Sequence, residues 1–93
     1  MTKEYYIKAA HGVREGIHNE LTTLPVDGKL AQEFHLGRLS MLLEIAAHDE
    51  TLRYEDYAKV ASEIAVIRRL IREEVYQSEI FEPANPRKYS VVH

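Results

Sequence analysis

The sequence predicts an all-α protein, an antiparallel three-helix bundle (up-down-up) over residues 1–80 with an extended C-terminal tail over residues 81–93. Apolar residues recur at steps of three or four along most of the chain, which is the period of an amphipathic helix. Two short segments interrupt that period, so three helical segments follow one another. Short turns favour antiparallel neighbours, and three apolar stripes are buried most simply by packing against one another.

The first helix is expected from about Lys3 to Thr23. Its apolar stripe consists of Tyr6, Ala10, Val13, Ile17, Leu21 and Leu24. Within this helix Gly12 and Gly16 lie one turn apart, and each costs about 1 kcal/mol relative to alanine. The pair predicts close packing of another helix, within the subunit or between subunits. Close approach of a ligand and simple tolerance of the two glycines are the alternatives.

The second helix is expected after the break at residues 25–28 and ends near His48. The side chain of Asp27 can cap it by accepting hydrogen bonds from the first free N–H groups. Its buried side is predicted to carry Leu30, Phe34, Met41 and Ile45. The helix is also apolar at Leu36, Leu39, Leu42 and Leu43, which is wider than one core-facing stripe requires. It is therefore either the central element of the bundle or part of a subunit interface formed by Leu36, Leu39 and Leu43 with Gly12 and Gly16.

The third helix is expected to start after a cap at Thr51 or Arg53 and to run to about Glu79. Leu52 can pack on Tyr57 as a hydrophobic staple, and acidic residues fall in the first turn, where the helix dipole favours them. Its stripe is Tyr57, Ala61, Ile64, Ile67, Ile71 and Val75. Pro83 and Pro86 end the helical pattern. The apolar residues 89–92 in the tail could pack on a neighbour or pair as a short strand, and a frayed terminus is the alternative.

Composition excludes several classes of function. The 93 residues carry 12 Lys and Arg against 15 Asp and Glu, a net charge of −3, so binding to nucleic acid is unlikely. The absence of cysteine removes disulfides, thiol catalysis and cysteine-based metal centres, and it fits a cytoplasmic protein. No apolar run approaches the length of about 20 residues that a membrane span needs. A core of this size is modest, so a partner subunit would help to stabilise the fold.

Four arginines have no carboxylate three or four positions away on their own helix. They are Arg14, Arg38, Arg68 and Arg72. An antiparallel hairpin brings most of them to a similar height in the bundle, together with His18 and His35. Guanidinium groups suit phosphates and carboxylates, so these six residues form a candidate site for a small anionic ligand such as a nucleotide. The alternative is that glutamates reach across from neighbouring helices and pair with the arginines.

The sequence gives weaker support for a metal site or for catalysis. His11, Glu15 and His18 share one helix face at a spacing that can hold zinc, but no recognised metal motif accompanies them, and neither a metal nor another cofactor is predicted. No nucleophile lies in a catalytic sequence context and no glycine-rich phosphate loop is present, so the chain is not predicted to be an enzyme. The prediction is a non-enzymatic interaction protein, a homo-oligomer that regulates or inhibits a partner protein. The binder of a small anionic ligand is the alternative.

Overall fold

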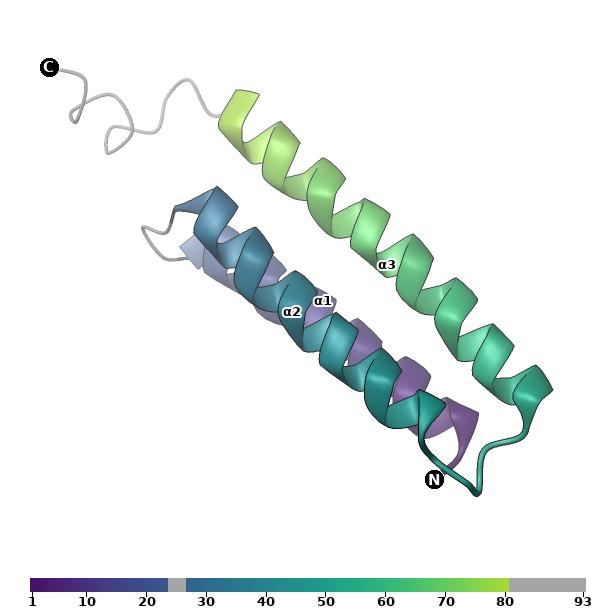
Figure 1. The fold of residues 1–93 in the computed structure, drawn as a ribbon. Helices are drawn as coiled ribbons and strands as arrows, with labels where there is room; N and C mark the ends of the chain where they lie inside the picture. The colour runs from purple at the N-terminus through teal and green to yellow at the C-terminus, as the bar shows by residue number, and fades with distance from the viewer. Residues whose placement is uncertain (24–26, 81–93) are drawn as a thin grey trace, which may run out of the picture.

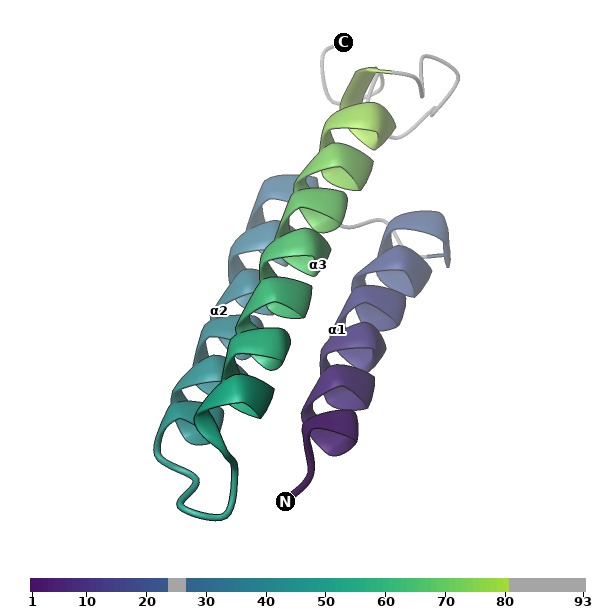
Figure 2. The ribbon, with the colours of Figure 1, turned by 90° about the vertical axis from the view of Figure 1, so that its right-hand side faces the viewer.

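The computed structural model describes residues 1–23 and 27–80, which form three α-helices. α1 comprises Lys3–Thr23, α2 comprises Gly28–Ala47 and α3 comprises Tyr54–Ile80. α2 runs antiparallel to α1 and α3, and every helix packs against the other two (Figures 1 and 2). The predicted antiparallel three-helix bundle is confirmed. The predicted tail over residues 81–93 and the break at residues 24–26, with Leu24 of the first stripe, lie outside the described residues.

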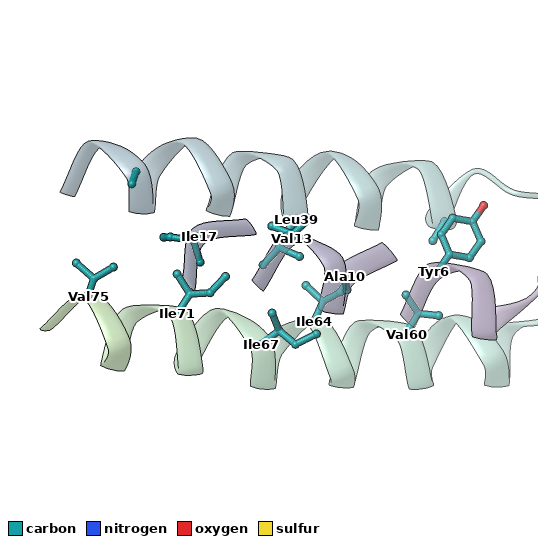
Figure 3. Packing of buried hydrophobic residues seen from close by; sticks show 12 residues of the cluster. Tyr6, Ala10, Val13, Ile17, Leu39, Val60, Ile64, Ile67, Ile71 and Val75 are labelled. Carbon is teal, nitrogen blue, oxygen red and sulfur yellow. The ribbon is translucent and has the colours of Figure 1, made fainter. Parts of the chain in front are cut away.

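The core consists of apolar side chains from all three helices, which meet along the axis of the bundle (Figure 3). The bundle is rod-shaped, with extents of 54 × 16 × 16 Å along its principal axes. α1 contributes four buried residues of its predicted stripe, and Leu21 packs beside them. The buried apolar residues of α3 are Val60, Ile64, Ile67, Ile71 and Val75. Four of these five belong to the predicted stripe of the third helix. Helical periodicity therefore identified the buried faces of α1 and α3.

For α2 the predicted buried face is wrong. Leu30, Phe34, Met41 and Ile45 are 65%, 63%, 59% and 51% exposed. The residues that α2 buries are Ala31, His35, Leu39 and Ala46. Because this helix is apolar over most of its circumference, its sequence contains no unique apolar stripe. Small alanines near both ends of the buried face allow α2 to lie close to its two neighbours, and the larger side chains are left outside.

α2 and α3 begin where the sequence predicts. Asp27 Oδ1 accepts hydrogen bonds from the backbone N–H groups of Lys29, at 2.9 Å, and Leu30, at 3.3 Å, as predicted for an N-cap. The backbone N–H of Tyr57 donates to the Arg53 carbonyl, so α3 begins after Arg53. None of the described helices combines the length and the apolarity that crossing a bilayer requires.

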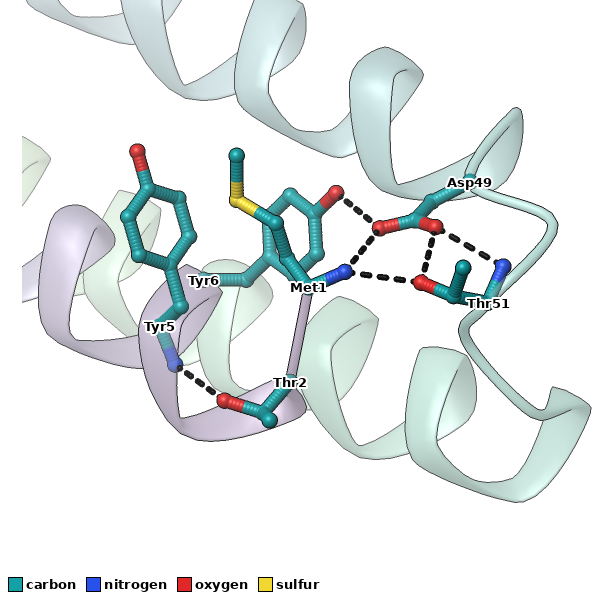
Figure 4. A network of polar contacts seen from close by, with 6 residues as sticks. All are labelled: Met1, Thr2, Tyr5, Tyr6, Asp49 and Thr51. Carbon is teal, nitrogen blue, oxygen red and sulfur yellow. Dashed lines mark hydrogen bonds and ion pairs between the residues drawn. The ribbon is translucent and has the colours of Figure 1, made fainter.

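The α2–α3 turn is fastened to the start of α1 by a polar network (Figure 4). Tyr6 donates a hydrogen bond to Asp49 Oδ2 across 2.6 Å, and the Met1 ammonium lies 3.1 Å from the same oxygen. The hydroxyl and the backbone N–H of Thr51 donate to Asp49 Oδ1. The hydrogen bonds from Thr51 and then from Tyr6 hold the pKa of the Asp49 carboxyl well below its usual range. Donation to Asp49, with burial, raises the pKa of Tyr6 to about 12.

Candidate functional site

Four large apolar side chains form an exposed row on the outer side of α2. We call Leu30, Phe34, Met41 and Ile45 the α2 stripe. Each of them is more than half exposed. Single exposed apolar residues are ordinary on protein surfaces, but four large ones on one helix face are more typical of an interaction site.

The α2 stripe borders a groove between α1 and α2. Met41 and Ile45 of the stripe line this groove, which has a volume of about 290 Å³. On its other side lie Ala9 and Val13 of α1. The groove therefore extends the apolar surface from the α2 stripe onto the neighbouring helix.

Of the two glycines of α1, Gly16 faces α2, and Gly12 lies on an exposed part of the helix. A methyl group added at Gly16 would meet His35 Cε1 at 3.6 Å and Arg38 Nη1 at 3.8 Å, which are ordinary contact distances. A methyl group added at Gly12 would meet no atom within 4 Å. Within the described residues Gly12 is thus not needed for packing inside the subunit. The missing side chain leaves the surface of α1 open at this position.

A buried histidine of α2 contacts one residue of the stripe. His35 is 1% exposed, and the ring of Phe34 packs edge-on against its imidazole with 5.0 Å between the ring centroids. The Arg38 guanidinium lies 3.2 Å from His35 Nδ1. Because a guanidinium can only donate, His35 Nδ1 is the acceptor in this contact. Nε2 lies 3.1 Å from Glu20 Oε1 of α1, within ion-pair range but out of line for a hydrogen bond.

The residues predicted as an interface on α2 lie mainly inside the subunit. Leu39 is fully buried, and Leu36 and Leu43 are half-buried against the core. Their own chain covers them because they point between α2 and its neighbours. α2 does carry more apolar residues than the core needs, as predicted, but the large apolar residues that remain exposed are those of the α2 stripe. The signal that could have identified them is the second apolar face, interrupted only at Gly37 and Arg38, that remains once the residues at 31, 35, 39 and 46 are assigned to the core.

The six residues predicted to bind an anion do not form one site. Arg38 lies at the α1–α2 groove with His35 beneath it, whereas Arg68 of α3 donates to Ser40 Oγ of α2 across 2.6 Å. Arg14 and His18 lie together in a hollow of about 370 Å³ on α1. Arg72 is exposed and has no hydrogen bond or ion pair to any described residue. Equal height along the bundle does not bring these groups together, because they lie on different sides of the rod.

The histidines of α1 contact carboxylates of α3. His11 Nε2 lies 3.1 Å from Glu63 Oε1, and His18 Nδ1 contacts Glu74 Oε2. Glu15 lines the same hollow as both histidines. Within residues 1–23 and 27–80 no three metal-ligating side chains are placed to hold one ion. The alternative interpretation expected glutamates to pair with the four arginines across the helices. In the described residues, these inter-helical glutamates contact histidines instead.

The chain was compared with protein-family models, with curated proteins and with solved structures, and no match was found in any of the three comparisons.

Proposed function

We propose that this chain is a non-enzymatic interaction protein that associates through the α2 stripe and the adjoining groove of α1. The observation that carries the proposal is the exposure of Leu30, Phe34, Met41 and Ile45, four large apolar side chains on one helix face. Burying such side chains is worth about 25 cal/mol per Å² of apolar surface, so a helix packed on this face would gain substantially.

The surroundings of the stripe also favour binding of a helix. The groove offers the ridge-and-groove surface into which helices pack, and Gly12 and Gly16 remove the side chains that would keep another backbone at a distance. Phe34 also packs on the buried His35, and the Arg38 guanidinium contacts the same imidazole. A preformed face of this kind loses little conformational entropy on binding.

In this proposal the protein is a cytoplasmic homo-oligomer that regulates or inhibits a partner protein by presenting helix faces. A regulatory effect follows if the oligomer and the partner compete for the same apolar surface, because only one helix can occupy the stripe at a time. The dispersed arginines give no comparable support to the binder of a small anionic ligand.

Sedimentation equilibrium over a range of concentrations tests the proposal. We expect an assembled species for the unmodified chain and a weaker association, by about tenfold or more, for Phe34→Glu, because a charge would be buried in the contact. The matched control is Tyr76→Glu on α3, where the wild-type side chain is 61% exposed and outside the stripe. Circular dichroism verifies that both variants remain folded.

Two results contradict the proposal. One is a monomer at all concentrations up to about 100 μM, above the Kd range of a specific association. The other is an assembly that Phe34→Glu and Tyr76→Glu weaken equally, because the contact would then not involve the stripe.

A further inference from the structure

We propose that the occupant of the α2 stripe is the α2 stripe of a second copy, packed antiparallel about a two-fold axis that passes between Gly37 and Arg38. This inference rests on the proposed function and specifies its partner and its register. It is based on the spacing of the four stripe residues along α2, which is the same when counted from either end of the helix.

The spacing is symmetric about the middle of α2. Leu30 lies as far before the point between Gly37 and Arg38 as Ile45 lies after it. Phe34 and Met41 are related in the same way. In a two-fold interface residue i contacts residue j and residue j contacts residue i, so a symmetric stripe is complementary to itself. Antiparallel packing would pair Leu30 with Ile45 and Phe34 with Met41, twice over.

The centre of the stripe is built for close approach. A methyl group added at Gly37 would meet no atom within 4 Å, so the backbone of α2 is open at this point. Glycine at a helix crossing allows two backbones to approach more closely than any other residue does. Arg38, on the other side of the axis, turns toward α1, because a methyl group added at Gly16 of α1 would lie 3.8 Å from its Nη1, and it also contacts His35 Nδ1 of its own helix at 3.2 Å. The guanidinium therefore lies in the α1–α2 groove beside the stripe, next to Gly16.

Charge at the ends of the stripe fits the same register. The symmetry that relates Phe34 to Met41 also brings Asp27, just before α2, level with His48, just after it. Both residues are exposed. In the antiparallel dimer each carboxylate would face an imidazole, which carries the opposite charge when protonated. In a parallel dimer, Asp27 would instead lie beside the second copy's Asp27, and His48 beside the second copy's His48, so that like groups would meet.

The exposed apolar surface of the stripe has the size of the centre of a dimer interface. The four large side chains of the stripe, each more than half exposed, offer roughly 400 Å² of largely apolar surface per copy. A specific interface buries about 800 Å² per partner, of which the rim is polar. The stripe would form the apolar centre of such an interface and the flanking polar residues of α2 its rim.

Disulfide trapping tests the register, since the chain contains no cysteine of its own. Phe34→Cys in one chain and Met41→Cys in a second chain, one carrying a mass tag, are mixed and oxidised mildly. We expect a covalent heterodimer in good yield. Phe34→Cys alone should give little homodimer, because the two thiols would be separated by about 10 Å along the helix axis. Tyr76→Cys serves as the exposed control outside the stripe.

Gly37→Ala provides a second measurement. It should stabilise the subunit, because alanine is the better helix former and the added methyl group meets no atom of its own chain. It should nevertheless weaken the association several-fold, because the methyl group would separate the two backbones at the axis. A variant that misfolds could not show both effects.

The outcomes separate this inference from the proposed function. A dimer that Phe34→Glu weakens, but in which Phe34→Cys is trapped with its own copy and not with Met41→Cys, overturns the antiparallel register and leaves the interaction function standing. A dimer that no stripe cysteine traps also overturns the inference. A monomeric chain overturns both proposals.

Discussion

The phenol of Tyr6 in α1 donates a hydrogen bond across 2.6 Å to Asp49 Oδ2 in the α2–α3 turn, although 43 residues separate them along the chain. The Met1 ammonium and Thr51 contact the same carboxylate (Figure 4). The network joins the start of α1 to the connection between the other two helices. It therefore fixes all three helices at one end of the rod, and its ionisation affects the stability of the whole fold.

At alkaline pH the free energy of unfolding should fall as the pH rises from about 10 to about 12. The pKa of Tyr6 is raised to about 12 in the folded protein, whereas an unfolded tyrosine titrates near 10. Between these values the folded state holds a proton that the unfolded state has released, so stability decreases with rising pH. Urea unfolding at several pH values measures the slope. Tyr6→Phe should reduce it, and Tyr5→Phe, at an exposed position, should not.

At acid pH the Asp49 carboxylate should contribute stability that is complete above pH of about 4 and is lost as the pH falls below that value. The pKa of Asp49 is lowered in the folded protein, so the unfolded chain binds a proton first and acid favours unfolding. Asp49→Asn should therefore be less stable at neutral pH and less sensitive to acid. Glu50→Gln, at the exposed neighbouring position, is the control. Equal acid profiles for the wild type and Asp49→Asn would contradict the prediction.

Ile67 is fully buried in the middle of α3, whereas the adjacent Val66 is 38% exposed. We expect Ile67→Ala to lower the free energy of unfolding by about 2–5 kcal/mol, because it removes apolar contacts and leaves a cavity in a narrow core. Val66→Ala should change it by less than about 1 kcal/mol. Denaturant unfolding of both variants at one protein concentration gives the comparison. Similar losses at the two positions would show that α3 presents a different face to the core.

Gly12→Ala should stabilise the isolated subunit by about 0.5–1 kcal/mol. Alanine is the better helix former, and a methyl group at this position meets no atom of its own chain within 4 Å. The measurement is chemical denaturation at a protein concentration low enough to keep the chain monomeric. Gly16→Ala, whose methyl group would contact His35 and Arg38, should gain no more than Gly12→Ala. A clear loss of stability for Gly12→Ala in the monomer would contradict this prediction.

The sequence by itself determined the helices and two of their three buried faces. α1 and α3 each carry a single apolar stripe with polar residues opposite, so helical periodicity identified Ile17 and Ile67 as core residues. Asp27 identified the start of α2, because a capping carboxylate satisfies backbone N–H groups through local geometry alone. Such signals depend on residues that are close in sequence, and they remain valid whatever the neighbouring helices are.

Only the tertiary structure decided which way α2 faces and which distant groups meet. α2 is apolar on both candidate sides, so its rotation depends on the fit of Ala31 and Ala46 between the neighbouring helices and not on its own periodicity. That rotation exposed Phe34 in place of Leu39. It also placed Arg38 and Arg68 in different inter-helical grooves, because the side of the rod on which a residue lies is set by packing between helices.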